Sequence, residues 1–354
     1  MNARPWVAVA MSGGVDSSVA AALLVERGER VLGLMLRFWA GDDGGNRCCS
    51  PEDVALARKV AGQLGVPFYV LDAQDPFQRH VVDPFIRGYA QGRTPNPCLS
   101  CNRHIRWGLL LDHALTLGAV SLATGHYARL AEHDGRRLLL RARDRQKDQS
   151  YVLSVMSQAQ LSRAVFPLAE LTKQEVREHA RRLSLPVADR PESQDLCFVG
   201  EAGYREFLSR SGASLPPPGA IHDRDGRVLG RHTGLAEYTI GQRKGLGISA
   251  PAPLYVLEKD LEHNVLIVGG KNELGREEFE AGEVRWIDGQ TPKGPLRVSV
   301  RVRYKAREYD ALVTPLPGQR AHVQSLELIP DVTPGQAAVF YERDGCLGGG
   351  IILE

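Results

Sequence analysis

The chain has 354 residues, 43% of them hydrophobic, and a formal net charge of +2. A chain of this length can bury more than one core, so two or three domains are expected. The near balance of charge excludes polyanion binding through an overall electric field, so a nucleic acid would have to meet local basic patches. The absence of an apolar signal core and of any run of about 18 apolar residues predicts a cytoplasmic protein with no membrane partner.

In chain order, the first 200 residues alternate between strand and helix patterns. Apolar runs predict strands over 7–11, 31–36, 67–71 and 119–124, and helical periodicity predicts helices over 17–27, 51–64 and 102–117. Helix-end residues support these bounds, since Ser50 precedes Pro51, and Thr172 and Glu175 have capping-box spacing. The alternation predicts an α/β domain over 1–205 with a doubly wound parallel sheet, whose ligands bind at the carboxyl ends of the strands.

A loop of small residues, Ser12-Gly-Gly-Val-Asp-Ser17, joins the first predicted strand to the first predicted helix. Such a loop leaves backbone N–H groups uncovered at the positive end of the helix dipole, where phosphate oxygens bind. The two glycines allow close approach of an anion, the two serines can add hydroxyl donors, and Asp16 can hold Mg²⁺. No lysine follows, so this is not a Walker A motif. We call it the phosphate loop, and it predicts a nucleotide site.

A change of composition near residue 200 predicts a second domain over 206–272. Ser214-Leu-Pro-Pro-Pro-Gly219 has the composition of a stiff linker. Hairpins are expected around Asp225-Gly226 and Glu262-His-Asn264. The segment is therefore predicted to form a small β-rich domain.

The remainder, 273–354, is almost entirely strand-like and predicts a β-barrel. Within it, Leu296, Val298, Val300 and Val302 alternate with Arg297, Ser299, Arg301 and Arg303. Because successive strand residues point to opposite faces, one strand is expected to bury its apolar side and present three arginines on an exposed side. An exposed row of arginines would give this domain a physical reason to bind a phosphate backbone.

Two cysteines lie on a proline-stiffened loop, Thr94-Pro-Asn-Pro-Cys-Leu-Ser-Cys-Asn102, that leads into a predicted helix. The dipole at a helix N-terminus favours a thiolate, and Arg103 and Arg106 would add to this effect, so Cys101 is the candidate nucleophile. Cys98 and Cys101 could instead form half of a zinc site, although a second ligand pair is missing.

Four further cysteines lie outside this loop. Cys197 lies in Glu192-Ser-Gln-Asp-Leu-Cys-Phe198, at the end of the first domain. Cys346 and the pair Cys48-Cys49 are expected to be buried and inert. Six cysteines are too few for a secreted disulfide scaffold of this length.

Three further motifs are polar or glycine-rich. Ala-Thr-Gly-His-Tyr at 123–127 follows a buried strand, so Gly125 and His126 are expected at the same sheet edge as the phosphate loop. Lys147-Asp-Gln-Ser-Tyr151 has the composition of a loop, a helix start or simply a solvated face. The segment 238–247 combines two cations with three glycines, which suits phosphate contact as well as ordinary hairpins.

Together these motifs resemble those of the bacterial tRNA-specific 2-thiouridylases, a family of the PP-loop ATP pyrophosphatase superfamily. The resemblance covers essentially the whole chain, in order. The phosphate loop alone would specify only the superfamily, whereas the cysteine loops and both β domains narrow it to the thiouridylases. The matching segments are 12–17, 92–97, 101–102, 123–127, 147–151, 241–247, 333–336 and 346–350.

The resemblance implies an ATP-dependent sulfurtransferase that 2-thiolates the wobble uridine (position 34) of tRNA, in the tRNAs for lysine, glutamate and glutamine. ATP with Mg²⁺ would adenylate the C2 oxygen, because oxygen is a poor leaving group, and sulfur would then displace AMP. The positions implied to bind ATP are Ala10, Met11, Ser12, Gly13, Gly14, Val15, Asp16, Ser17, Leu36 and Gly125.

The resemblance also assigns roles to the cysteines and to the tRNA contacts. Cys197 would carry a persulfide, supplied by an upstream cysteine desulfurase or sulfur relay protein, and Cys101 would act as nucleophile and could form a disulfide with it. Asn96, Pro97 and Cys98 would face the target base, splayed out of the anticodon stack. Contact with tRNA would come from His126, Lys147, Asp148, Gln149, Arg303, Tyr304 and Gln336.

One residue departs from the more familiar family pattern, which has Asp where this chain has Cys98. A third thiol near Cys101 and Cys197 could complete a three-cysteine site for an iron–sulfur cluster, with one iron free to carry sulfur. Persulfide and cluster mechanisms therefore both stay open. Two alternatives remain for the function: an ATP pyrophosphatase that adenylates another substrate, and a non-catalytic RNA-binding protein with a structural metal.

Overall fold

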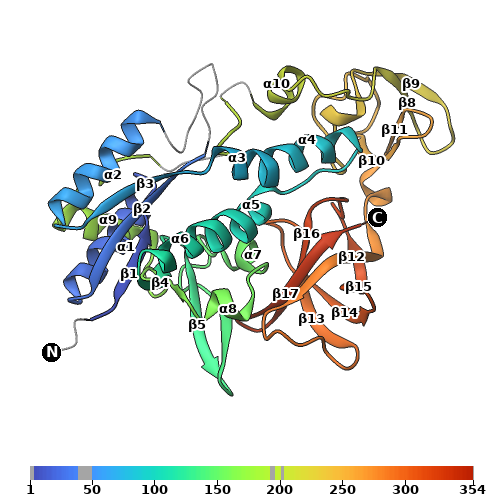
Figure 1. Ribbon diagram of the computed structural model, residues 1–354. Coiled ribbons are helices and arrows are strands. Elements are labelled where there is room, and N and C mark those ends of the chain that lie inside the picture. Colours follow the sequence, from blue (N-terminus) through green and yellow to red (C-terminus); the bar gives the residue numbers. More distant parts are fainter. Residues whose placement is uncertain (1–3, 39–49, 192–195, 201–202, 354) are drawn as a thin grey trace.

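The structure is a computed structural model that describes residues 4–38, 50–191, 196–200 and 203–353. Figure 1 shows a sheet flanked by helices, then a small β-rich region, then a barrel of C-terminal strands. This arrangement confirms the predicted fold class. In the ranges described, no helix has both the length and the apolar character needed to cross a membrane.

The first region is built on a five-stranded parallel sheet in the order β3-β2-β1-β4-β7. Its strands are β1 (Trp6–Ala10), β2 (Arg30–Arg37), β3 (Phe68–Asp72), β4 (Ala119–Ala123) and β7 (Ala164–Val165). β2 is buried from Val31 to Leu36, which is the continuous apolar pattern of a strand covered on both faces. The first four strands lie where the sequence predicts them, whereas two-residue β7 was not predicted.

Helices pack on both faces of this sheet, because alternate side chains point into two different apolar clusters. Ala8 and Leu34 pack with the helices between β3 and β4, whereas Val9 and Met35 pack with α1 (Val15–Glu26), α2 (Pro51–Gln63) and α9 (Lys173–Arg182). The remaining helices are α3 (Gln74–Phe77), η1 (Gln78–Val82), α4 (Asp83–Ala90), α5 (Pro97–Ser100), η2 (Cys101–Leu110), α6 (Leu111–Thr116), α7 (Ser150–Leu153) and α8 (Gln158–Leu161).

The helix ends are those that local chemistry favours. Ser50 caps α2 and Thr172 caps α9, and both form the complete reciprocal capping box. The helix predicted over 102–117 is instead one helical run from Pro97 to Thr116, because Pro97 begins it and its middle section, η2, is π-helical.

The strand order determines where a ligand can bind. β1 and β4 are neighbours, and the chain leaves β1 towards β2 on one side but enters β4 on the other. The crevice between their carboxyl ends is therefore the point at which the strand order reverses. The phosphate loop follows β1 and Gly125 follows β4, so both border this crevice.

A small β-rich region follows α10 (Gly203–Arg210). Its elements are β8 (Gly219–His222), β9 (Val228–His232), η3 (Leu235–Glu237), β10 (Tyr255–Asp260), β11 (Val265–Gly269) and η4 (Lys271–Glu273), with the strand order β10-β11-β8-β9. Both predicted hairpins are confirmed, since antiparallel strands flank Gly226 and Asn264. These two turn residues have φ values of +83° and +54°.

The C-terminal strands close into a barrel, because β12 pairs with both β15 and β17. The six strands are β12 (Arg276–Trp286), β13 (Leu296–Arg301), β14 (Tyr309–Leu316), β15 (Arg320–Ile329), β16 (Ala337–Glu342) and β17 (Gly345–Ile352). Val298 and Val300 of β13 are buried in its core, as predicted.

A hairpin from the first region joins the sheet of the barrel. It consists of β5 (Ala128–His133) and β6 (Arg136–Arg141), and β6 pairs with β17 at Cys346 and Gly345. β12 covers β17 only from Gly348 onward, so the first residues of β17 would otherwise be an open edge. The hairpin falls within the predicted domain 1–205 by sequence, but its hydrogen bonds tie it to the barrel.

Candidate functional site

Two carbonyl oxygens of the phosphate loop are hydrogen-bonded within the protein. Ser17 Oγ donates to the carbonyl of Gly14 at 3.1 Å, and Arg190 Nη1 donates to the carbonyl of Gly13 at 2.9 Å. The N–H groups in the first turn of α1 have no helical acceptor, and the helix dipole favours an anion there. The buried Ser17 hydroxyl also accepts from Ser12 N at 3.1 Å, so it belongs to the frame of the loop.

Gly125 forms the other wall of the crevice. A Cβ placed on Gly125 would lie 2.7 Å from Ser17 N and 2.8 Å from the carbonyl carbon of Asp16, closer than real side chains approach. The chain after β4 therefore touches the phosphate loop, and only glycine fits there. Ala10 ends β1, and Leu36 lies buried near the end of β2, so both residues expected near the nucleoside are at this sheet edge.

Asp16 is bonded to two residues from distant parts of the chain. Lys173 Nζ lies 2.7 Å from each carboxylate oxygen, and Tyr127 Oη donates to Oδ1 at 2.8 Å. The sequence lacks a lysine after the loop, and the fold supplies one from the first turn of α9. The sequence did not point to a role for Lys173. The only signal was its position directly after the cap residue Thr172, which places it in the first turn of a helix. For Arg190, the sequence carried no signal.

The cysteine loop is shaped by a local cap. The Asn96 side chain accepts from Cys98 N at 3.1 Å and caps α5, with Pro97 buried at its first position. The helix therefore begins at Pro97, so the expectation that Cys101 lies at a helix N-terminus is wrong. Cys98 occupies the first turn and is exposed, whereas Cys101 lies one turn further and is only 8% exposed.

The two cations expected to assist Cys101 have other partners. Arg103 Nη1 lies 2.7 Å from a Glu283 carboxylate oxygen of the barrel. Arg106 Nη1 lies 3.2 Å from His126 Nε2. Cys101 is a buried member of the large apolar cluster between the sheet and the helices that follow β3, and the partly buried Cys197 packs against the same cluster.

The remaining thiols do not extend this site. In the ranges described, no three His, Cys, Asp or Glu side chains are grouped so that they could hold a metal ion. Burial raises the pKa of the Cys346 thiol to about 12, which keeps it neutral, as expected of an inert cysteine. Cys48, Cys49 and the segment 192–195 lie outside the described residues.

His126 lies behind the crevice and is only 4% exposed. Burial, with a smaller contribution from Arg106, lowers its pKa to about 3. Its Nδ1 lies 2.8 Å from Thr124 Oγ1, and its ring packs against Trp107 and Phe166, which also contact each other. His126 is therefore a neutral residue of the interior, and the structure does not place it on a surface that RNA reaches.

The Lys147–Gln149 motif is mostly internal. Asp148 is 5% exposed, and it accepts from Ala142 N at 2.9 Å and Ser150 Oγ at 2.7 Å. Gln149 Oε1 accepts from Tyr127 N at 3.0 Å, and Gln149 N donates to the Tyr127 carbonyl at 2.8 Å. Lys147 is half-buried. The motif therefore supports the chain that follows Gly125.

The barrel docks on the cysteine loop through its 333–336 turn. Gln336 Nε2 donates to the Thr94 carbonyl at 2.7 Å, and Thr94 N donates to the Pro334 carbonyl at 2.8 Å. A Cβ on Gly335, whose φ is +92°, would lie 3.0 Å from the Thr94 carbonyl carbon. The loop that carries Cys98 and Cys101 is thus held from the opposite end of the chain.

Arg301 is not exposed, which overturns the expected arginine face. Its side chain is 14% exposed and lies 2.6 Å from Glu308 and 3.8 Å from Asp148. Arg141 shares Glu308 at 2.7 Å, and both guanidinium groups lie over the Tyr341 ring. Two of these residues come from β6 and the segment that follows it, and three come from the barrel, so we call them the seam (Arg141, Asp148, Arg301, Glu308 and Tyr341).

Arg303 joins the barrel to the β-rich region. It donates to the Ile240 carbonyl at 2.9 Å and to Thr333 Oγ1 at 2.8 Å, and its side chain is 30% exposed. The neighbouring Tyr304 is half-buried, with its ring centroid 6.1 Å from that of Tyr151. The exposed cations Arg243 and Lys244 follow Ile240, so Arg303 anchors the start of a basic loop.

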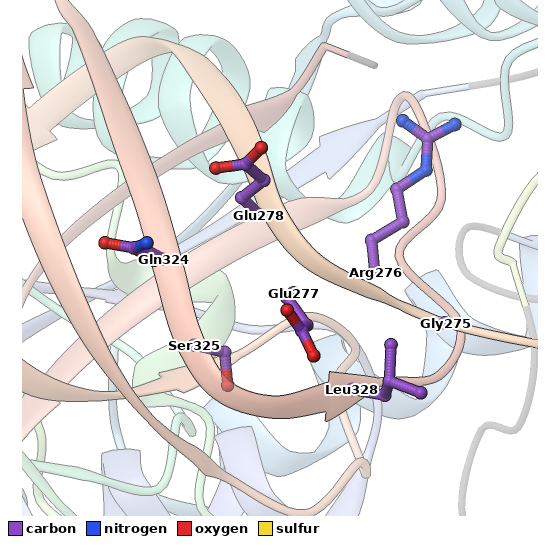
Figure 2. A pocket seen from close by; sticks show the side chains of 7 residues that line it. All are labelled: Gly275, Arg276, Glu277, Glu278, Gln324, Ser325 and Leu328. Atoms are coloured by element: carbon purple, nitrogen blue, oxygen red, sulfur yellow. The ribbon is translucent and has the colours of Figure 1, made fainter.

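A surface hollow of about 530 Å³ lies elsewhere, between β12 and β15 (Figure 2). Its lining includes Glu277, Glu278, Gln324 and Leu328, and none of its residues belongs to the phosphate loop or the cysteine loop. The candidate functional site is therefore the crevice, where the phosphate loop lies, and not this hollow.

Known proteins match nearly the whole chain. Residues 5–201 match the model described as "tRNA methyl transferase HUP domain", residues 205–270 the "tRNA methyl transferase PRC-barrel domain", and residues 276–352 the "Aminomethyltransferase beta-barrel domain". The tRNA-specific 2-thiouridylase MnmA of Chloroflexus aurantiacus is 49% identical over 352 residues, which is 98% of each chain. That of Moorella thermoacetica is 48% identical and covers 97% of this chain and 98% of its own.

Proposed function

The chain belongs to the tRNA-specific 2-thiouridylase family, and from that premise we propose that it is an ATP-dependent sulfurtransferase that replaces the C2 oxygen of the wobble uridine of tRNA, position 34, by sulfur. The observation that carries the proposal is the phosphate loop, whose carbonyls are bonded within the protein beside Gly125, in the same domain as Cys101 and Cys197. The reaction is assigned to the cytoplasm, where thiols stay reduced.

In the first step, ATP binds with its phosphates on the phosphate loop (Ser12, Gly13, Gly14, Val15, Asp16 and Ser17). Its nucleoside lies near the sheet edge, beside Ala10, Met11, Leu36 and Gly125. The C2 oxygen of uridine attacks the α-phosphorus and pyrophosphate leaves, which converts a poor leaving group into AMP. Lys173 lies at the loop and is placed to stabilise charge on the phosphates. Asp16, whose two oxygens now bond Lys173 Nζ, would hold Mg²⁺ together with the phosphates and so neutralise part of their charge.

In the second step, the terminal sulfur of a Cys197 persulfide attacks C2 and AMP departs with the oxygen. The Cys101 thiolate then attacks Cys197 Sγ, so the sulfur–sulfur bond to the uridine breaks and a Cys101–Cys197 disulfide forms. The uridine keeps the sulfur as a thiocarbonyl. An upstream cysteine desulfurase or sulfur relay protein supplies the persulfide, and a thiol reductant resets the disulfide.

The target base is proposed to face Asn96, Pro97 and Cys98, since Cys98 is exposed on the loop that leads to Cys101. Lys147, Gln149, Arg303, Tyr304 and Gln336 are proposed to contact or orient the tRNA. His126 and Asp148 are buried, so we assign them to supporting these contacts from behind. The proposed substrates are the tRNAs for lysine, glutamate and glutamine.

The test uses unmodified tRNA, ATP labelled at the α-phosphate, Mg²⁺ and a persulfide donor. The expected products are AMP, pyrophosphate and tRNA that contains 2-thiouridine, identified by mass spectrometry of its nucleosides. Cys101→Ser and Cys197→Ser should each abolish the thiolated nucleoside. Formation of ADP in place of AMP, or a methylated nucleoside without sulfur, would contradict the proposal.

A further inference from the structure

We propose that Arg190 is a positioning residue of the nucleotide site, which holds the phosphate loop in its anion-binding conformation by bridging it to the first turn of α2. The inference rests on the proposed function, because the loop is the one assigned to ATP. Arg190 belongs neither to the loop nor to the residues that the family motifs mark. Its role comes from contacts with two segments far away in the sequence.

Arg190 uses both arms of its guanidinium group. Nη1 donates to the Gly13 carbonyl at 2.9 Å, and Nη2 forms a short bond to Asp53 Oδ1. The Asp53 side chain is 3% exposed, and its second oxygen accepts from Ser50 N at 3.0 Å as part of the α2 capping box. A nearly buried carboxylate that is fixed by a helix cap provides a rigid anchor for the planar fork of an arginine.

The loop also lies directly against this anchor. Gly13 has a φ of +74°, and a Cβ on it would lie 2.7 Å from the Asp53 carbonyl oxygen. Gly13, with its left-handed backbone conformation, therefore contacts the first turn of α2. Arg190 bridges the phosphate loop and α2 at the same point. Three contacts meet here, and together they define the orientation of the Gly13 carbonyl.

That orientation decides what the crevice offers to a phosphate. The Gly14 carbonyl is already held by Ser17 and Ser18, at 3.1 and 2.8 Å, whereas the Gly13 carbonyl is held by Arg190. A peptide between two glycines can rotate by about 180° at little steric cost. Without Arg190, rotation of the Gly13–Gly14 peptide would turn a carbonyl towards the phosphate and remove an N–H donor.

This mechanism predicts an unusual rescue. Gly14 has a φ of −91°, and rotation of the preceding peptide would move it to about +90°, which alanine disfavours strongly. A Cβ on Gly14 has room in the present conformation, since its nearest neighbour is Ser12 Oγ at 3.4 Å. Gly14→Ala should therefore block the rotation and make the loop less dependent on Arg190.

The experiment measures binding of Mg²⁺ with α,β-methylene ATP by calorimetry, without tRNA. Arg190→Gln should weaken binding by about tenfold, as expected for loss of a charge-assisted hydrogen bond, and Arg190→Lys should weaken it less. In the Gly14→Ala background, Arg190→Gln should weaken binding by about twofold or less. The matched control is Arg182→Gln, which removes an exposed bidentate pair with Glu26 at 2.8 and 2.9 Å. It should leave binding within about twofold.

An equal loss from Arg190→Gln in both backgrounds, or no loss in either, would overturn the inference. Thermal unfolding of each variant identifies any that fails to fold, and Arg190→Lys then carries the same comparison across the two backgrounds. AMP release by the unaltered protein with tRNA is measured in parallel. If that protein binds the analogue with the expected Arg190 dependence but releases no AMP, the proposed function fails while the positioning role stands.

Discussion

The crevice and the seam both pair basic side chains with a carboxylate, but they differ in how the carboxylate is paired and exposed. In the crevice, the Lys173 side chain is 12% exposed and is paired with Asp16, whose side chain is 33% exposed. In the seam, Arg141 and Arg301, each 14% exposed, share the 22% exposed Glu308, and both guanidinium groups lie over the Tyr341 ring. The cations are about equally buried in the two regions, so the difference lies in the anions: Asp16 keeps more contact with water than Glu308, and it pairs with one cation whereas Glu308 is shared by two.

This difference separates function from stability. A variant of the crevice removes a group that a ligand needs but leaves few buried charges unpaired. A variant of the seam leaves a partly desolvated charge without its partner, which costs folding free energy. The two regions should therefore respond differently when a single charge is removed from each.

The largest effect is expected from Lys173→Met in the crevice. Loss of a cation beside the developing charge of the phosphates should reduce AMP formation by about 10²–10³-fold. The thermal midpoint should change little, because the Asp16 partner is partly hydrated. Lys59→Met, on the exposed side of α2, is the control and should keep full activity. AMP formation by Lys173→Met within about threefold of normal would remove Lys173 from the proposed step.

The seam should show the reverse pattern with Glu308→Gln. Two arginines lose the carboxylate that they share, so the free energy of unfolding should fall by about 2–3 kcal/mol, at the lower end for buried pairs because the site is not fully sealed. AMP formation per folded molecule should stay near normal. Denaturant unfolding is compared with that of Glu327→Gln, which breaks the exposed pair with Arg307 and should cost under about 1 kcal/mol. Equal costs for both variants would mean that burial does not distinguish the seam.

His126 should make the free energy of unfolding depend on pH. Burial lowers its pKa to about 3, against about 6.5 in the unfolded chain, so the unfolded state binds the proton first as the pH falls. This contribution to stability is complete above pH 6.5 and decreases below it. From pH 7 to pH 5, the free energy of unfolding should fall by about 2 kcal/mol through His126 alone.

His126→Gln should therefore lose less stability than the unaltered protein over that pH interval, when unfolding is measured at both pH values. His133→Gln serves as the control, because the His133 side chain is 75% exposed. A His126→Gln variant with the same pH dependence as the unaltered protein would show that folding does not lower the pKa of His126.

The smallest effect concerns binding of tRNA. Arg243 and Lys244 are exposed on the loop that Arg303 anchors, so their joint replacement by alanine should lower the salt slope of tRNA binding by about two. Arg301→Ala removes the same kind of charge from the seam and should leave the slope unchanged. If Arg301→Ala lowers the slope as much as the double variant, the seam opens to RNA and the contrast fails.

Much of the fold could be predicted because its signals are local. Strand runs, the caps at Ser50 and Thr172 and the Asn264 turn depend on residues within a few positions of one another. The position of the phosphate loop also followed, since a loop after a parallel strand has to lie at the carboxyl edge of the sheet. The fold class, the edge on which Gly125 lies and both hairpins were therefore accessible from the sequence.

The partners of the charged groups were not accessible in this way. Lys173 reaches Asp16 across 157 positions, Arg190 reaches Gly13 across 177, and Arg141 reaches Glu308 across 167. The alternation along β13 correctly predicted the face of the strand on which Arg301 lies. It could not predict that this face is covered, because the β5–β6 hairpin that helps to cover it comes from the first domain. The sequence by itself determined which elements form and where the loop lies, because periodicity and capping act over a few residues. Only the tertiary structure decided which charges are open to a ligand, because burial depends on segments that meet after the chain has folded.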